Sequence, residues 1–399
     1  MERPGSSWQG FDNLKPDSEK YKRIQLLFSS ANFEYLETCA IESRRKHQPS
    51  LSLDVSCSID LKRFASGFNN VVLEIAFSDS VFWVARIPHQ TLNDSDKISL
   101  LSEITTMRII QRHTTIPIPQ VFSFEMSTDQ PFGYPYMFME HRGHSLPNGL
   151  ATTVPYEHRP KVAKQLANVF TELQNLTFSR IGRLWCGDGA DQPVQVIAME
   201  WHASPGPLET SFEYFYNQKQ AENRESIDLH PDDPDWLTAC WGPRPFSSMS
   251  SRSTLHYGNM LFDKEYNLTG IIDWSSAQAA PLEQLSVCPE FTTFPGMSDE
   301  ENQPMVDFKS LVVQYIREIE QEQERKPPRD NPDLDIAGQS NLMPLSTYMA
   351  SKSAEITYRQ YMSSPRGALF AGKMVAGLIY GKSVTWDQLK EVYGAIPLS

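Results

Sequence analysis

The chain has 399 residues, 40% of them hydrophobic and 21% charged, which is enough for two lobes with one substantial core each. The formal net charge of -13 argues against a nucleic-acid-binding protein, whose surface would normally carry a basic stripe. The cysteines are scattered and lack the spacing of a zinc site or a disulfide framework, so we expect free thiols at Cys39, Cys57, Cys186, Cys240 and Cys288.

Neither end of the sequence has the pattern of a membrane or export signal. The segment Met1 to Trp8 lacks the apolar core and the cleavage site of a signal peptide. The longest small apolar run near the other end, residues 367–380, is too short to span a bilayer and contains Lys373. We therefore expect a cytoplasmic protein that binds neither membranes nor nucleic acid.

Apolar residues recur at helical spacing in the first part of the chain. Tyr21, Ile24 and Leu27 begin a series that predicts one or two helices between residues 18 and 46. We interpret residues 1–50 as an N-terminal helical extension in front of the next domain.

Two apolar segments, residues 71–77 and 81–87, are separated by a short polar turn and predict a β-hairpin. The predicted loop in front of it, residues 64–70, contains Gly67 and Asn69. One interpretation is an ordinary hairpin that follows a glycine turn. The other is a loop whose backbone NH groups approach phosphates.

Four further elements follow in chain order. A helix is predicted over residues 99–111, with Glu103 inside it, and two prolines then favour an extended segment over 116–121. The pattern indicates a strand over 134–140 and an amphipathic helix over about 158–176.

The segment from residue 186 to 241 is irregular and rich in proline and acidic residues. Its carboxylates are either a solvated surface or a surface that suits a cationic substrate. Later helices are predicted over about 306–324, 345–362 and 386–393.

Two polar residues in apolar surroundings, Asn259 and Asp273, have the chemistry of magnesium ligands. Tyr257-Gly258 and an apolar segment flank Asn259, which places its amide oxygen on a loop where it can bind a metal. Asp273 lies between Ile272 and Trp274, and a buried ionised carboxylate is costly unless it is paired or metal-bound. The alternatives are a turn-forming Asn259 and an Asp273 that caps a following helix.

The stretch from Leu255 to Phe262, followed by Ile271-Ile272-Asp273-Trp274, resembles the aminoglycoside phosphotransferase and choline kinase-like family. That family carries the loop His-Gly-Asp-x-His-x-x-Asn and a metal-binding Asp after two apolar residues. The resemblance covers roughly residues 64–289. It implies an α+β, protein kinase-like two-lobe fold, with a small antiparallel β lobe (51–143) and a larger helical lobe (144–399).

The resemblance also implies an ATP site with Mg²⁺. Val84-Ala85-Arg86 resembles the strand in which a Lys contacts the phosphates, and Arg86 would pair with an acidic residue of the next helix. The implied nucleotide-binding residues are the phosphate loop, this cation with its partner, and the hinge: Gly67, Asn69, Arg86, Glu103, Met139, Glu140 and His141. Asn259 and Asp273 would bind Mg²⁺.

The first half of the catalytic loop departs from the family's pattern, because Arg252, Ser253 and Thr254 stand where the family has His, Gly and Asp. Thr254 marks the position of the missing base, since its hydroxyl cannot replace a carboxylate. Most of the catalysis comes from positioning and electrostatics, so slow transfer is still allowed. His256 would brace the loop, and a further hypothesis gives it part of the proton transfer.

The predicted function is transfer of the ATP γ-phosphate to a hydroxyl of an unidentified small substrate. The alternative is a nucleotide-binding pseudokinase without the catalytic Asp and with a regulatory or scaffold role. Residues 243–254 are rich in serine where an apolar strand would be expected. They reflect either real divergence or a local error in the gene sequence.

Overall fold

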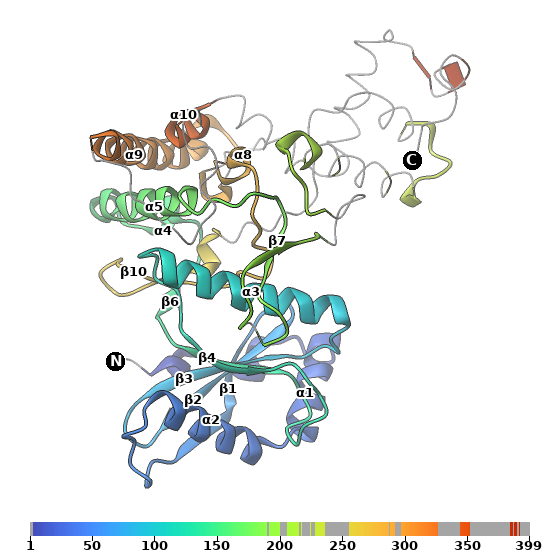
Figure 1. Cartoon of the computed structure of the whole chain (residues 1–399), viewed down its shortest axis with the longest axis vertical. Coiled ribbons are helices and arrows are strands. Elements are labelled where there is room, and N and C mark those ends of the chain that lie inside the picture. The colour runs from blue at the N-terminus through green and yellow to red at the C-terminus, as the bar shows by residue number, and fades with distance from the viewer. Residues whose placement is uncertain are drawn as a thin grey trace.

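In the computed structural model the chain forms two lobes, a sheet lobe and a helical lobe (Figure 1). The structure describes residues 3–189, 191–199, 206–214, 217, 224, 228–235, 255–286, 288–291, 297–325, 344–351, 384–385, 387–388 and 391. The predicted α+β, two-lobe architecture is present, and the lobe that contains the antiparallel sheet precedes the helical lobe in the sequence.

The sheet lobe is built on five antiparallel strands in the order β1-β2-β3-β5-β4. These are β1 (Cys57–Ser66), β2 (Asn70–Phe77), β3 (Phe82–Pro88), β4 (Val121–Glu125) and β5 (Tyr136–Glu140). The predicted loop over 64–70 was too long, because β1 continues to Ser66. Its alternation is hidden in the sequence by a register shift between Ile59 and Phe64.

Two helices, which the sequence pattern predicted for the N-terminal part of the chain, cover one face of this sheet. They are α1 (Glu19–Ser30) and α2 (Phe33–His47), preceded by the short turns η1 (Pro4–Ser7) and η2 (Gly10–Asn13). Buried Ile24 and Leu36 from the helices pack in one core with Leu73 and Ile75 of β2. The helices therefore share their core with the sheet.

Helix α3 (Asp94–His113) packs on the opposite face of the sheet and is longer than predicted. Its first turn is polar and so lacks apolar periodicity, but Asn93 and Asp96 form a capping box that starts the helix. Buried Ile104 and Met107 join the core that contains Val84 of β3. This core continues into the helical lobe.

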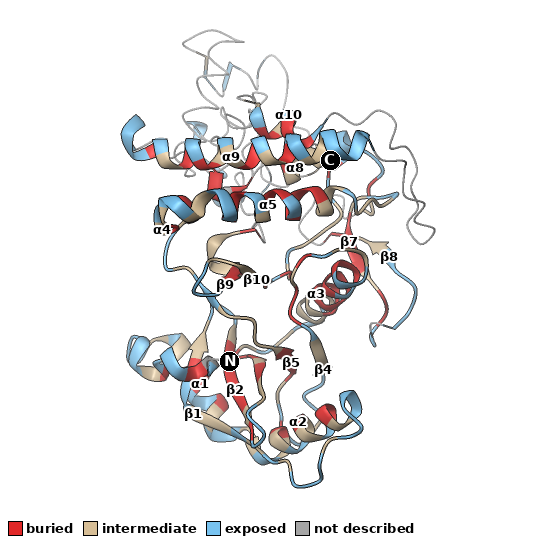
Figure 2. Cartoon of the chain, turned by 90° about the vertical axis from the view of Figure 1, so that its left-hand side faces the viewer, coloured by how far each residue is buried: buried red, intermediate tan, exposed pale blue. Residues whose placement is uncertain are grey.

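The helical lobe is centred on α5 (Arg159–Gln174) and α9 (Asp299–Glu324), which run side by side and bury facing sides (Figure 2). Helix α9 begins seven residues before the predicted start, where Ser298 and Glu301 form a capping box. The remaining helices and turns are α4 (Leu150–Thr153), η3 (Tyr156–His158), α8 (Leu282–Leu285), η5 (Pro289–Phe291) and α10 (Leu345–Ala350).

The remaining strands are short and form two further sheets, one of which carries the segments of Asn259 and Asp273. They are β6 (His144–Ser145), β9 (Met260–Phe262) and β10 (Leu268–Ile271) in one sheet, and β7 (Arg183–Trp185) with β8 (Gln195–Ile197) in another. The turn η4 (Tyr257–Asn259) precedes β9. The helix expected beyond Ala350 and the one over 386–393 lie mainly outside the described residues.

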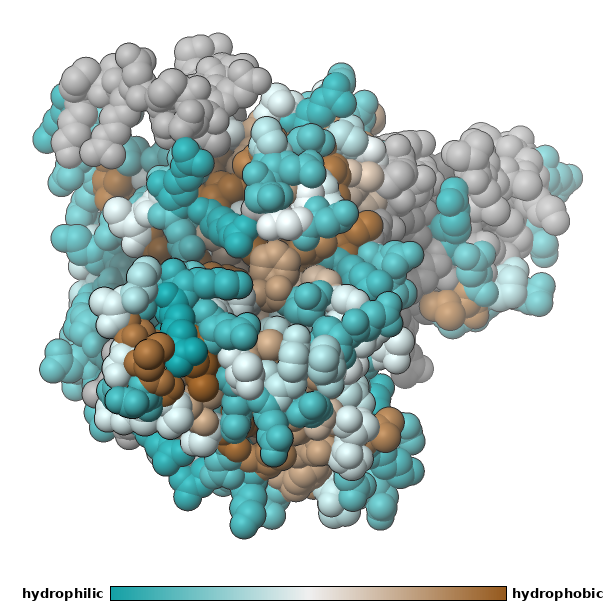
Figure 3. All heavy atoms as spheres, turned by 60° about the horizontal axis from the view of Figure 1, so that its bottom comes forward, coloured by the Kyte–Doolittle hydropathy of each residue, from teal (hydrophilic) through white to brown (hydrophobic). Residues whose placement is uncertain are grey.

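The described cysteines are free thiols, which confirms that expectation for Cys39, Cys57, Cys186 and Cys288. Among the described residues, no helix has the length and apolar character needed to cross a membrane. One face of the molecule is mostly hydrophilic, with hydrophobic residues gathered in separate patches (Figure 3).

Candidate functional site

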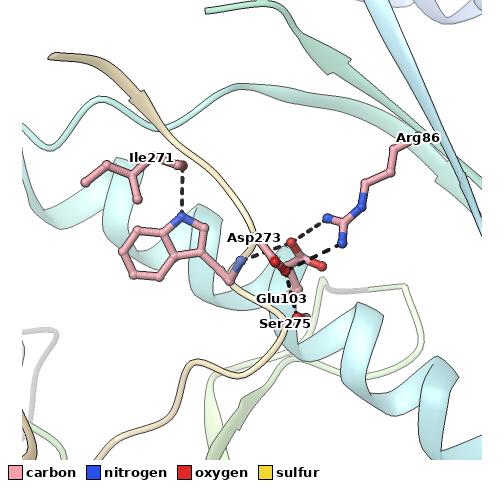
Figure 4. A network of polar contacts seen from close by, with 6 residues as sticks. Arg86, Glu103, Ile271, Asp273 and Ser275 are labelled. Carbon is pink, nitrogen blue, oxygen red and sulfur yellow. Dashed lines mark hydrogen bonds and ion pairs between the residues drawn. The ribbon is translucent and has the colours of Figure 1, made fainter. Parts of the chain in front are cut away.

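The predicted pair between Arg86 on β3 and Glu103 on α3 is present in the structure. Arg86 Nη1 donates to Glu103 Oε1 at 2.6 Å, and Figure 4 shows the two side chains pointing toward each other. Position 86 lies on the face of β3 that α3 covers, and position 103 lies inside the buried stripe of the helix. Strand pleating and helix periodicity together therefore bring the two charges into contact.

Glu103 is completely buried, with an exposed fraction of 0%. Burial raises the pKa of its carboxyl, and the neighbouring Arg86 cation opposes that rise. Its Oε1 also accepts from Trp274 N at 3.1 Å, while Oε2 has no partner among the described residues. The carboxylate thus links the sheet lobe to the segment that follows β10.

Asp273 lies at the end of this link and completes a charged group with Arg86 and Glu103 (Figure 4). Arg86 Nη2 is 3.8 Å from Asp273 Oδ1, and Ser275 Oγ donates to the same oxygen at 2.8 Å. The Asp273 side chain is 48% exposed, so the carboxylate can reach a ligand. The helix-cap alternative is wrong, because the next described helix, α8, begins at Leu282.

The backbone at Asp273 has φ +61, in the left-handed region that side chains other than glycine rarely adopt. Such strain persists only where the surrounding structure fixes it. Here the contacts of Trp274 N with Glu103 and of the Trp274 indole with Ile271 O hold the turn on either side.

The hairpin of β9 and β10 brings Asn259 and Asp273 to one end. Met260 pairs with Ile271, and Ile272 N donates to Asn259 O at 2.9 Å. Asn259 is also the last residue of the turn η4. It therefore both forms a turn and lies beside Asp273. An amide oxygen and a carboxylate are hard oxygen donors of the kind that Mg²⁺ prefers. This donor set fits the predicted ion.

No cluster of three or more His, Cys, Asp or Glu side chains occurs in the part of the chain that the structure describes. A site for Zn²⁺ made of protein groups alone is therefore absent from that part. Mg²⁺ commonly takes only one or two carboxylates and completes its shell with water and substrate phosphates, so the pair of oxygen donors suffices for it.

His256 contributes to the shape of the loop. Its Nδ1 accepts from Gly258 N at 3.2 Å, and its ring lies against that of Tyr257, with centroids 4.1 Å apart. These contacts fit the predicted bracing role. A part in proton transfer stays a prediction.

Glu290 also holds this loop, and no sequence pattern indicated it. This buried carboxylate accepts from Tyr257 N with one oxygen and from Leu150 N with the other, both at 2.9 Å. It thereby joins η4 to the start of α4. A single Glu in a short irregular segment has no pattern that points to a partner 140 residues away.

The turn between β1 and β2 carries the predicted phosphate loop. Asn69 O accepts from His89 N, and its side-chain oxygen accepts from Gln90 Nε2. A Cβ on Gly67 would meet nothing closer than Asn70 O at 3.9 Å, and its φ is not positive. The fold itself therefore does not require glycine there, which leaves room for the phosphate interpretation.

Asn70 is a partner of Arg86 that sequence reasoning did not assign. With the side-chain oxygen turned toward the guanidinium, it accepts from Arg86 Nε and Nη2, both at 3.2 Å. Its place at the end of the predicted loop was the only signal in the sequence, and only the strand register shows that it lies beside Arg86.

The predicted hinge residues lie at the end of β5. Met139 is buried in the core shared by both lobes, and the Glu140 carboxylate binds Arg142 Nε at 2.8 Å and Gln120 N at 3.2 Å. Burial, with a smaller effect of His144, lowers the pKa of His141 to about 4. His141 is therefore neutral near pH 7.

Thr254 and residues 243–253 lie outside the described residues, as does much of the acidic segment. Within the part that is described, Glu213 accepts from the backbone NH groups of Glu209 and Thr210 and so caps a local turn. That contact has a structural explanation, and a substrate role for the acidic segment stays a prediction.

A family model described as a phosphotransferase enzyme family matches residues 60–284. No curated protein matches the chain. Solved structures that are similar include a protein from Ralstonia eutropha JMP134 proposed to be an aminoglycoside phosphotransferase, at 12% identity and a TM-score of 0.43, covering 90% of this chain and 99% of that one.

Two further similar structures are enzymes of known substrate type. A macrolide 2'-phosphotransferase from Brachybacterium faecium is 12% identical with a TM-score of 0.41, covering 90% of this chain and 98% of that one. The GDP complex of aminoglycoside 2'-phosphotransferase-IIIa is 14% identical with a TM-score of 0.39, covering 89% and 95%.

Proposed function

Because the chain belongs to the phosphotransferase enzyme family, we propose that it transfers the γ-phosphate of ATP to a hydroxyl of a small substrate. The observation that carries the proposal is the charged group of Arg86, Glu103 and Asp273, with Asn259 beside Asp273. It combines a cation for phosphates with oxygen donors for a metal, which are the parts that phosphoryl transfer needs.

Each residue has a distinct task in this proposal. Arg86, fixed by Glu103 and Asn70, presents a guanidinium to the phosphates. Asn259 and Asp273 hold Mg²⁺, which neutralises charge on the phosphates when it is bound. Glu140 is the last residue of β5 and His141 follows it at the hinge, where the base would lie.

The acceptor hydroxyl needs a residue to orient it and take its proton, and Thr254 stands at that position in the sequence. This observation favours the second candidate function, a pseudokinase that binds Mg²⁺ and nucleotide without turnover. The two candidates differ in catalysis and share the nucleotide site.

The test is calorimetric binding of ATP with and without Mg²⁺, followed by ADP release with a panel of aminoglycosides, choline-like amines, sugars and homoserine-like alcohols. We expect Mg²⁺ to tighten ATP binding, and Asp273→Asn to remove most of that gain, because the metal loses a charged ligand. Asn tolerates a positive φ, so this variant should keep its fold.

Glu265→Gln is the matched control, since it removes an exposed carboxylate from the same hairpin. ADP release with an acceptor would support the kinase, and Mg²⁺-dependent binding without release would support the pseudokinase. Absence of ATP binding with Mg²⁺ would contradict both.

A further inference from the structure

One face of the sheet carries the residues that a nucleotide would contact. Strand side chains alternate between the two faces, so residues two apart share a face. The register aligns two neighbouring rows on the face of Arg86, namely Val72, Arg86 and Met137 in one row and Glu74, Val84 and Met139 in the other. The rows are about 7 Å apart.

A nucleotide with its phosphates at Arg86 and its base at the hinge would lie beneath the second row. That row ends at Met139, directly before Glu140. The base and ribose therefore need the space in front of Val84 and Glu74.

The N-terminal segment, residues 3–8, lies on this same face. Arg3 Nε donates to Glu74 Oε1 at 2.5 Å, and Gly5 N donates to Glu74 Oε2 at 2.7 Å. Trp8 packs against the core cluster that includes Val84 and Met139. Figure 1 shows the first described residues, in dark blue, against the sheet lobe.

Glu74 is the anchor of the segment. Its side chain is 4% exposed, although it stands in a strand whose other inward residues are apolar. A buried carboxylate needs a cation or hydrogen-bond donors. The recorded partners of both its oxygens come from the N-terminal segment, 71 and 69 residues away in sequence. The segment is therefore held by specific charged contacts.

We propose that residues 3–8 are an internal competitor, which occupies the base end of the nucleotide cleft and is displaced when a nucleotide binds. This inference rests on the nucleotide site of the proposed function. Release breaks the contacts of Arg3 and Gly5 with Glu74 and withdraws Trp8 from the core, while Phe11 keeps its packing on Phe64. The fold of the lobe therefore survives the opening.

A competitor of this kind lowers apparent affinity by the fraction of molecules in which the site is open. If about one molecule in ten is open, removal of the segment tightens nucleotide binding about tenfold. The contacts with Glu74 favour the closed state. Weakening them should therefore also tighten nucleotide binding, but by less than removal of the segment.

The test compares Mg-ADP binding by calorimetry in the full chain, in Arg3→Ala, in Glu74→Gln and in a chain that lacks residues 1–8. Arg63→Ala is the control, because it removes an exposed arginine whose ion pair joins residues of a single strand. Deuterium uptake of residues 3–8, measured by mass spectrometry, reports directly on release.

We expect the truncated chain to bind Mg-ADP about tenfold more tightly, with Arg3→Ala and Glu74→Gln in between and Arg63→Ala unchanged. Mg-ADP should also raise deuterium uptake of residues 3–8 in the full chain. Glu74→Gln keeps the test decisive if the truncated chain does not fold.

Equal affinity in all variants, with the segment still protected in the presence of Mg-ADP, would overturn the internal competitor and leave the nucleotide site standing. If neither the full nor the truncated chain binds Mg-ADP or Mg-ATP, the proposed function fails, and the competitor fails with it.

Discussion

In the sheet lobe the charged side chains of the candidate site hold one another, whereas in the helical lobe the loop that carries Asn259 is held through its backbone. Arg86 and Glu103 form a buried ion pair. The turn η4 is held instead by Glu290, which accepts a backbone NH, and by the ring of His256.

The difference matches what each lobe contributes to the proposed site: the sheet lobe presents a cation to phosphates, and the helical lobe presents ligands to a metal. A guanidinium aimed at phosphates needs a fixed direction before the ligand arrives, and a buried carboxylate provides it. Metal ligands must be able to exchange water for the ion, so Asp273 stays about half exposed while its backbone is fixed. We expect substitutions of the charged pair in the sheet lobe to cost the most stability, and substitutions of the metal ligands in the helical lobe to act mainly on ligand binding.

The largest effect is expected for Glu103→Ala, which removes the buried carboxylate that pairs with Arg86. Among the described residues, this leaves the guanidinium only Asn70 and the more distant Asp273. We expect a loss of about 3–5 kcal/mol in the free energy of unfolding, measured with urea. The double variant Arg86→Met/Glu103→Leu is the control and should lose much less, because apolar residues of similar volume replace the whole pair. A cost for Glu103→Ala no greater than for the double variant would contradict the comparison.

The next effect concerns the brace of the helical lobe. Glu290→Gln keeps the shape of the side chain but turns an NH₂ group toward one of two backbone NH groups, so we expect a loss of about 1–3 kcal/mol in unfolding free energy. Mg²⁺-dependent ATP binding should weaken as well, because η4 moves. Glu283→Gln on nearby α8 is the control, and an equal effect of both variants would argue against a specific brace.

A smaller effect is expected at the hinge, and it depends on pH. The His141 pKa is lowered in the folded chain to about 4 from 6.5, so the unfolded chain takes up this proton first as pH falls. The contribution to stability is present above pH 6.5 and is lost as pH falls toward 4. His141→Asn should flatten that part of the stability curve in urea unfolding at several pH values. The exposed neighbour gives the control His144→Asn, and an unchanged curve in His141→Asn would refute the assignment.

The smallest effect on stability is expected for Gly67→Ala, because a Cβ there meets only Asn70 O at 3.9 Å. Unfolding free energy should stay constant or rise by about 0.4–1 kcal/mol, since alanine restricts the unfolded chain. ATP binding should nevertheless weaken if the backbone approaches phosphates. Unchanged binding would favour the ordinary hairpin turn.

Patterns with a local cause were predictable from the sequence. Apolar periodicity predicted α1, α2 and α5, and apolar segments bounded by turns predicted β2, β3 and β5. The pair of Arg86 and Glu103 was also predictable, because the resemblance to a known family supplied the partner. The strand β1 was missed because a register shift hid its alternation. The predicted starts of α3 and α9 were too late, because polar capping boxes begin these helices before their apolar periodicity appears.

The sequence by itself determined the helices and strands that have an apolar pattern, and which residue types, Asn259 and Asp273 above all, can bind a metal. Only the tertiary structure decided which buried charges meet. Glu74 faces Arg3 across 71 residues, and Glu290 joins Leu150 to Tyr257. The physical reason is that periodicity reports which face of an element is buried, whereas the partner of a buried carboxylate is chosen by the packing of elements far apart in the chain.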